Sequence, residues 1–481
     1  MALRIHRLVL PLRFPEGLSA GEGRNGNQAY IAKDGQDRPI LRGTALAGAL
    51  RHEWAYRFGG NAAVWFGDAA GANGQEVCLD VSSVLRTPDC LLVLGVDLVG
   101  VRTHNAINRH TGAVLDGGLF SMEAVPPGTT TQVCLWLHDE RDAPAAGKIF
   151  LQQLVRLVTD GLTLGGNAAR GIGRVELAGP ALYMAYDLGN IDDHATYLDE
   201  NRTWRGGSLP TTGSPLDPAA EAAKGVLAVE IELGIPLGED LLVADGQGCD
   251  FEMEPQRVTA ADGKLYWRIP GSSLRGVFRG WFTRLAARQG IPVADSHQRQ
   301  QERQHTCTAL KGDDLAWGFD SESERQHKQS MIVNADGSVN WGVYDTEIDC
   351  PIMQLFGSAF GKGRLHIADA LSVDPVAKQG NKCAKEEKRA HVAVDRFTGG
   401  ANEGFFFVNS VLTDTRFRTT ITLRDPDKNE VQWLIGTLRA LQVGVLRVGS
   451  SKAGGRLSLA ATPKARGELS DYFKKTDWTE A

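Results

Sequence analysis

The segment that decides the fold is RGTALAGALR at residues 42–51, because a second segment of the same design, PGSSLRGVFR, occurs at residues 270–279. Both place a glycine before small or hydroxyl residues and then an apolar run that ends in arginine. The offset between the two glycines is 228 residues (271 − 43). One short match can arise by chance in 481 residues, so the interpretation depends on further matches in the same order.

Three more motifs recur in that order. They are WFG (65–67) with LFG (355–357) at offset 290 (357 − 67), His104 through NRHTG (108–112) with His391 through DRFTG (395–399) at offset 287 (399 − 112), and GIGRVEL (171–177) with GGRLSL (454–459) at offset 282 (456 − 174). Four collinear matches predict a duplicated unit. The step from 228 to 290 places 62 extra residues (290 − 228) in the second copy, between Arg279 and Leu355.

Hydrophobic periodicity predicts the same elements in both copies. Each opens with alternating apolar residues, at 3–10 and 226–233, which is typical of a strand with one buried face. In the second copy we expect Ser272 and Ser273 to cap a helix from Leu274 to about Arg288. Later strands are predicted at 130–137 and 419–423, and later helices at 149–158 and 431–441. The order strand, helix, strands, helix, strand predicts an α+β fold of two tandem ferredoxin-like, RRM-like modules.

The domain organisation follows from the repeat boundaries. We predict a first module at residues 1–185, a linker at 186–224, a second module at 225–465 with an insertion at about 285–350, and a C-terminal tail at 466–481. The linker is expected to lack regular structure, because residues 190–224 are rich in turn residues without strong periodicity.

Bulk composition is that of an ordinary globular protein, with 42% hydrophobic and 23% charged residues. The net charge of −6 argues mildly against a free-standing nucleic-acid binder, so any basic surface must be local. We expect no signal peptide and no membrane contact, because the N-terminus and the rest of the chain lack long apolar runs. Seven scattered cysteines suit a reducing cytoplasm.

These motifs resemble the RAMP superfamily of CRISPR-associated proteins. The segment IPGSSLRG at 269–276, LFG followed by GRL at 363–365, the stretch from His391 to Gly399 and the last glycine-rich turn fall in the order of that family. Together they resemble the repeating backbone subunit of type III effectors, the "Cas seven" family, as a fused double subunit of a type III-D-like system. The linker and the insertion lie outside the resemblance.

The resemblance implies a modified RNA-recognition fold with a thumb-like hairpin in each copy. It implies CRISPR RNA (crRNA), single-stranded target RNA and other effector subunits as partners. It also implies target cleavage with a loop aspartate and a divalent metal such as Mg²⁺. A non-cutting scaffold of the same fold is one alternative. A guide-processing endoribonuclease of the superfamily, which would use a metal-independent histidine mechanism, is another.

Two kinds of glycine-rich segment are candidate RNA contacts. A helix start presents N–H groups and a positive dipole end to phosphate, and neighbouring arginines add charge without reading sequence. The alternative is an ordinary capped helix with solvated arginines. The candidate RNA-binding residues are Arg42, Gly43, Thr44 and Arg51 in the first copy, Gly271, Ser272, Ser273, Arg275 and Arg279 in the second, Arg170, Arg174, Arg447, Lys452 and Arg456 at the later glycine-rich turns, and Arg109 and Arg396 in the hairpins.

The resemblance places the cutting aspartate in the loop between the first strand and the glycine-serine motif. Asp250 best matches that position in the second copy, with Asp245 as the runner-up. Asn27 or Gln28 takes the place in the first copy, and an amide is a weaker base and metal ligand than a carboxylate. We therefore expect the second copy to cut through attack of the target's own 2′-hydroxyl, assisted by Asp250 and Mg²⁺, and the first copy to bind only. The alternative is a solvated turn aspartate.

Cysteine and histidine in and beside the insertion suggest a structural zinc ion. The candidate ligands are His305, Cys307, Cys350 and Cys383. The motif CPIM at 350–353 lacks one thiol that some relatives carry there, so the spacing is weak. The alternative is a set of buried cysteines.

Overall fold

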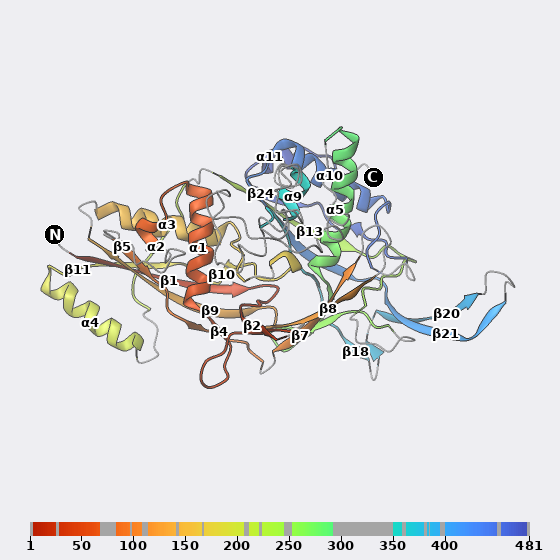
Figure 1. Ribbon diagram of the computed structural model, residues 1–481, viewed down its shortest axis with the longest axis horizontal. Helices are drawn as coiled ribbons and strands as arrows, with labels where there is room; N and C mark the ends of the chain where they lie inside the picture. The colour runs from red at the N-terminus through yellow and green to blue at the C-terminus, as the bar shows by residue number, and fades with distance from the viewer. Residues whose placement is uncertain are drawn as a thin grey trace, which may run out of the picture.

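The computed structural model describes residues 3–25, 28–67, 83–96, 99–107, 114–140, 144–165, 168–205, 211–220, 224–244, 253–291, 350–357, 362–379, 382–383, 385–394, 400–449 and 454–478. Two α+β modules lie side by side along the long axis of the molecule, with the N-terminus at one end (Figure 1). The predicted fold class is therefore confirmed.

The first module is built on an antiparallel sheet with the order β11-β1-β9-β5, and β12 extends it beyond β11. This is the strand order of a ferredoxin-like unit, in which the first strand lies in the middle. The elements are β1 (Arg4–Phe14), β2 (Gly21–Asn25), β3 (Gln28–Ile31), β4 (Ile40–Leu41), α1 (Gly43–Phe58), α2 (Ala63–Phe66), β5 (Ser83–Arg86), β6 (Cys90–Leu91), β7 (Gly100–Ile107), β8 (Val114–Ala124), β9 (Thr129–Asp139), α3 (Pro144–Thr159), η1 (Ala168–Arg170), β10 (Glu176–Leu177), β11 (Leu182–Asp187), α4 (Ile191–Arg205) and β12 (Ser214–Pro215).

The second module repeats this plan, with β22 between β13 and the pair β16 and β17, and with β23 and β24 on the other side of β13. Its elements are β13 (Val226–Gly234), β14 (Arg257–Thr259), β15 (Leu265–Ile269), α5 (Gly271–Arg288), α9 (Pro351–Phe356), β16 (Leu365–Ile367), β17 (Ala370–Ser372), β18 (Lys378–Gln379), β19 (Lys382–Cys383), β20 (Glu386–Val394), β21 (Ala401–Leu412), β22 (Arg416–Arg424), α10 (Lys428–Gln442), β23 (Ser458–Leu459), β24 (Lys464–Gly467) and α11 (Ser470–Lys474).

Each module carries one long hairpin in the equivalent place. The β7–β8 hairpin pairs His104 opposite Phe120, and the β20–β21 hairpin pairs His391 opposite Phe407. The β20–β21 hairpin projects from the end of the molecule (Figure 1). The shared register supports the repeat that the sequence motifs predict.

The two central strands differ in burial, and the reason is helix α4. β13 buries Leu227, Val229 and Ile231 in the core on one face. On its other face Glu230 is exposed, whereas Val226 and Ala228 are buried. β1 is buried on both faces, because Leu8 packs under α1 and α3 and Val9 packs with the α4 side. The expectation of a single buried face is therefore wrong for β1.

Helix α4 also corrects the expectation that residues 186–224 lack regular structure. Its position on the sheet is fixed by the buried guanidinium of Arg7, which donates to Glu200 and to the Thr212 hydroxyl at 3.0 Å. Strand β12 then pairs with β11, Leu182 opposite Pro215. This segment therefore packs on the first module.

The helix after the second glycine motif has the predicted apolar face but not the predicted cap. Leu274, Phe278 and Phe282 are buried against the sheet. α5 begins at Gly271, so Ser272 and Ser273 lie inside its first turn and neither of them is its N-cap. The expectation that these serines cap the helix is wrong, because the carboxylate of Asp369 accepts the N–H of Gly271 at the helix start.

Candidate RNA-binding surface

The two glycine motifs form the same structure, a helix start that packs against a loop after a strand. The Gly43 N–H donates to the carboxylate of Asp89 at 2.7 Å, and the Gly271 N–H donates to the carboxylate of Asp369 at 2.8 Å. A Cβ at residue 43 would lie 1.8 Å from the Thr87 carbonyl oxygen. Glycine is therefore required for close packing.

This geometry corrects one expectation about phosphate binding. The first N–H of each helix is already used by an aspartate, and Gly43 and Gly271 are both buried. The aspartates also bring negative charge to the helix starts, where it is favourable. These two N–H groups therefore do not hold phosphate in this conformation.

The outer side of each helix remains open beyond the glycine. Thr44 is exposed, and Ser272 and Ser273 are half-exposed. One turn further on, Gly48 and Gly276 are exposed, and nothing lies within 4 Å of where their Cβ would be. A small, hydroxyl-bearing helix surface lets a ligand backbone approach closely. Both modules present this surface.

The arginines of the first helix lie beside this surface in different surroundings. Arg42 forms an ion pair with Asp89 at 3.0 Å and is 37% exposed, so a polyanion can compete for it. Arg51 donates to the carbonyl oxygen of Gly67 at 3.0 Å and is half-buried. Arg42 is thus the more accessible cation of the first helix.

The arginines of the second helix are more deeply held. Arg275 donates to the Leu365 carbonyl and lies over the Phe356 ring at 5.3 Å. Its pKa is lowered to about 10, first by burial and then by the charge of nearby Arg279. Arg279 contacts the Met353 sulfur at 3.2 Å and is half-buried. Two close guanidiniums attract phosphate, but little of their surface is open here.

The glycine-rich turns carry a second set of arginines. One of them, Arg174, is buried and bonded to carboxylates of the protein itself. It donates to Glu16 at 2.7 Å and to Glu176, and it is 6% exposed. It therefore does not belong to an RNA surface. Arg170 is half-buried over the Phe120 ring at 4.2 Å.

In the second module the equivalent turn is open. Arg447 is exposed and donates to the Gly454 carbonyl at 2.9 Å. Arg456, the counterpart of Arg174, lies 3.8 Å from Glu239 with 40% of its side chain exposed. The same ion pair is thus buried in the first module and accessible in the second.

The reason is that the second module covers this side of the first. Arg102 of β7 donates to the buried carboxylate of Asp369 at 2.5 Å, which joins the modules at the start of α5. The Asp369 N–H donates to the Gly171 carbonyl at 2.8 Å, and a Cβ at residue 171 would lie 2.8 Å from the Gly271 Cα. Arg424 adds an ion pair with Glu53 at 2.6 Å. The two modules therefore meet at one of the repeated helix starts.

Asp89, Asp369 and Arg102 are not among the site residues predicted from the sequence. Asp89 and Asp369 are separated by 46 and 98 residues from the glycines that they bind, so no local pattern connects them. One signal was available, because Asp89 and Asp369 each come two or three residues after a short strand, at offset 280 (369 − 89).

Several predicted site residues fall outside the described part of the chain. These are Asp245, Asp250, Lys452, Arg109, Arg396, His305 and Cys307, together with the side chain of Cys383. Cys350 is described, and it packs at 2% exposure among the core side chains of the second module. Within the described residues, no cluster of three or more metal-binding side chains occurs.

The model of the RAMP superfamily matches residues 9–176 and 248–458, which is one match for each module. The chain belongs to the RAMP superfamily. The first match ends in β10, so α4 and β12 lie between the two RAMP matches.

No curated protein matches the sequence. Among the described helices, none is long and apolar enough to cross a membrane.

Proposed function

We propose that this RAMP protein is a backbone subunit of a type III CRISPR effector complex, of type III-D-like organisation, which binds crRNA and target RNA. The observation that carries the proposal is the pair of equivalent helix surfaces, Thr44 with Gly48 and Ser272 with Gly276. Contacts from hydroxyls, backbone and arginines position an RNA backbone without reading its sequence. A protein that accepts any guide needs contacts of this kind.

RNA binding is tested with bulky acidic residues on these surfaces. Thr44→Glu with Gly48→Glu, and Ser272→Glu with Gly276→Glu, should each weaken crRNA binding at least about tenfold, because each adds negative charge beside the RNA path. The control is Ala195→Glu, which adds a negative charge to the exposed surface of a different helix, α4. Unchanged affinity in both surface variants, measured by filter binding at fixed salt, would refute the proposed surface.

For cleavage, we assign the second module as the cutting one, with Asp250 and Mg²⁺ assisting attack by the 2′-hydroxyl of the target. The support is the family position of Asp250 and the amides that replace it in the first module. When bound, the metal would stabilise charge on the phosphate. A non-cutting scaffold remains the second candidate, because loop aspartates are often only solvated.

The assembled complex, with guide and labelled target, separates these candidates. Asp250→Ala and removal of Mg²⁺ with EDTA should each abolish cutting while target binding is retained, and Asp245→Ala serves as the matched loop variant. Cutting that resists EDTA would instead favour a histidine mechanism. Cutting that survives Asp250→Ala would overturn the assignment.

Other effector subunits are the proposed protein partners, and the internal junction suggests where they dock. Arg102 at the junction corresponds to Arg389 at offset 287 (389 − 102), in the equivalent hairpin of the second module. Arg389 pairs with Asp240 at 2.9 Å, and 41% of its side chain is exposed. In the first module, Asp89 caps Gly43 as Asp369 caps Gly271. The hairpin arginine Arg389 and the helix start at Gly43 are therefore the two halves of a second junction like the internal one.

A further inference from the structure

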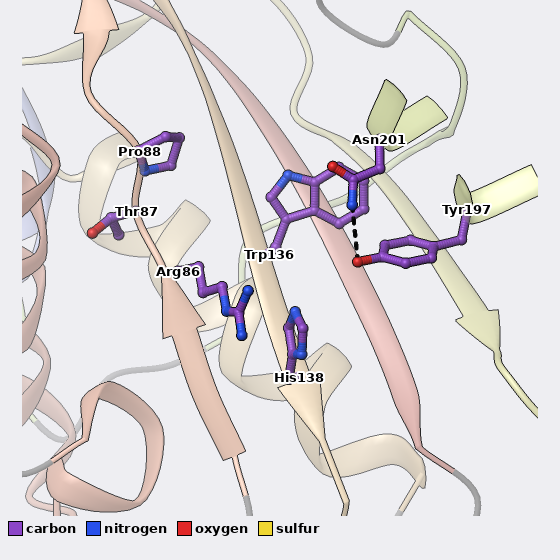
Figure 2. A pocket seen from close by; sticks show the side chains of 7 residues that line it. All are labelled: Arg86, Thr87, Pro88, Trp136, His138, Tyr197 and Asn201. Atoms are coloured by element: carbon purple, nitrogen blue, oxygen red, sulfur yellow. Dashed lines mark hydrogen bonds between the residues drawn. The ribbon is translucent and has the colours of Figure 1, made fainter. Parts of the chain in front are cut away.

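A small hollow lies in the first module, away from the helix surfaces described above. It is bounded by Arg86 from β5, Trp136 and His138 from β9, and Tyr197 and Asn201 from α4, and it encloses about 180 Å³ (Figure 2). Pockets for drug-sized ligands usually enclose about 300–1,000 Å³. This hollow therefore suits part of a ligand or one small ligand.

Strand and helix periodicity explain why these side chains converge. Trp136 and His138 are two residues apart on a strand and so point to the same face of the sheet. Arg86 lies opposite Trp136 in the β5–β9 register. Tyr197 and Asn201 are four residues apart on α4 and so share one side of that helix. The hollow is thus closed by a helix that lies outside both RAMP matches.

One end of the hollow is aromatic and fixed in place. Trp136 is 4% exposed and makes an edge-to-face contact with Tyr197 at 5.5 Å. The Asn201 amide donates to the Tyr197 hydroxyl at 3.1 Å. Within the described residues these two groups make no further hydrogen bond, which leaves the amide oxygen and the phenolic proton for a ligand. A ring with donors and acceptors on its edge matches this end.

At the other end, Arg86 and His138 lie near each other (Figure 2). Arg86 is exposed, whereas His138 is half-buried. Burial lowers the pKa of His138, and the charge of Arg86 lowers it further. The imidazole is therefore neutral at pH 7 and can donate or accept, while Arg86 carries the charge. The lining residues that the structure describes include no carboxylate, so an anion is favoured over a cation.

We propose that this hollow binds one nucleotide, with its base against Tyr197 and the edge of Trp136, the Asn201 amide at the base edge and Arg86 at the phosphate. The unit is either one residue of a bound RNA or a free nucleoside monophosphate. In the chain, Arg86 is followed directly by the loop 87–89, which packs on the start of α1. The hollow lies on the face of the sheet that α4 covers, whereas α1 lies on the other face. The RNA form of this inference rests on the proposed function.

Free nucleotides provide the first test. Saturation-transfer NMR on the full chain with each of the four nucleoside monophosphates should show binding of at least one of them. Arg86→Ala and Asn201→Leu should each weaken that binding about tenfold, which is the loss expected for one hydrogen bond. Leu198→Ala is the matched control, because Leu198 lies on the same helix and is 55% exposed. No binding by wild type, or equal binding by the variants, overturns the proposal.

A second test distinguishes the two sources. crRNAs that carry 2-aminopurine at successive positions should show, at one position, a fluorescence change that Asn201→Leu removes, if the nucleotide belongs to RNA. If monophosphates bind and no position responds, the ligand is a free nucleotide. Total RNA affinity is measured in parallel, so RNA binding that fails while monophosphate binding holds would refute the proposed function and leave the hollow's ligand class intact.

Discussion

At the scale of single residues, buried charge fixes how the two modules meet. Arg102 and Asp369 are 5% and 1% exposed and are 267 residues apart in the chain. Asp369 also accepts a hydrogen bond from the N–H of Gly271. One carboxylate therefore caps the start of α5 and pairs with an arginine of the first module. None of this was predictable from the sequence, since an ion pair across modules leaves no periodic or local trace.

Removing one member of this pair should be costly. Arg102→Ala leaves a buried carboxylate with less compensation, and the expected loss of unfolding free energy is about 3–5 kcal/mol. The comparison is Arg416→Ala, whose ion pair with Glu232 is 56% exposed on the arginine side, and it should cost less than about 1 kcal/mol. Denaturant unfolding followed by circular dichroism measures both. Equal effects would show that the junction does not depend on this pair.

His366 makes stability depend on pH. Its pKa is lowered to about 3, first by burial and then by the charges of Arg174 and Lys362. In the unfolded chain a histidine binds a proton near pH 6.5. The unfolded state therefore gains protons first as pH falls, and the stability that is complete above about pH 6.5 is lost progressively toward pH 3.

The measurement is the unfolding free energy between pH 7 and pH 4. His366→Gln should flatten this profile, whereas His194→Gln, on the exposed side of α4, should leave its slope unchanged. A slope that is the same in wild type and His366→Gln would contradict the assignment.

At the scale of elements, the sequence predicted those whose stability is local. The capping box of α10 joins Asp427 and Glu430, three residues apart, and the observed helix contains the predicted one. By contrast, α4 has few apolar residues, and a salt bridge to Arg7 in β1 holds it on the sheet. That contact is 193 residues away, so the segment was predicted as a linker.

The two glycines in the early turns of α5 should respond oppositely to alanine. A Cβ at Gly271 would lie 2.3 Å from the Ile367 carbonyl oxygen, so Gly271→Ala should destabilise by about 1–3 kcal/mol or more. A Cβ at Gly276 meets nothing within 4 Å, so Gly276→Ala should stabilise by about 0.5–1 kcal/mol through helix propensity. Thermal unfolding checks both. Destabilisation by Gly276→Ala would show that its exposed surface is already covered.

At the scale of the whole molecule, duplication explains both the fold and its exposed ends. The motif order predicted two modules, and the family match covers one region in each. The packing of one module on the other was not predictable, because it depends on residues such as Arg102 that lie outside the shared motifs. That packing buries the Arg174–Glu16 pair and leaves the equivalent Arg456–Glu239 pair open.

The open end should therefore matter for assembly and not for folding. Arg389→Glu is expected to reduce co-purification with other effector subunits severalfold while the melting temperature of the isolated chain changes little, because Arg389 is 41% exposed. Lys388→Glu, at the neighbouring exposed position of the same strand, is the control. Normal assembly of Arg389→Glu would show that this surface does not bind the other subunits.

Ultraviolet crosslinking of crRNA to the protein, with the linked peptides identified by mass spectrometry, tests the central claim most directly. The account predicts crosslinks in both helix-start segments, residues 42–51 and 270–279. Crosslinks confined to other surfaces, or to one module alone, would contradict a duplicated RNA-gripping unit.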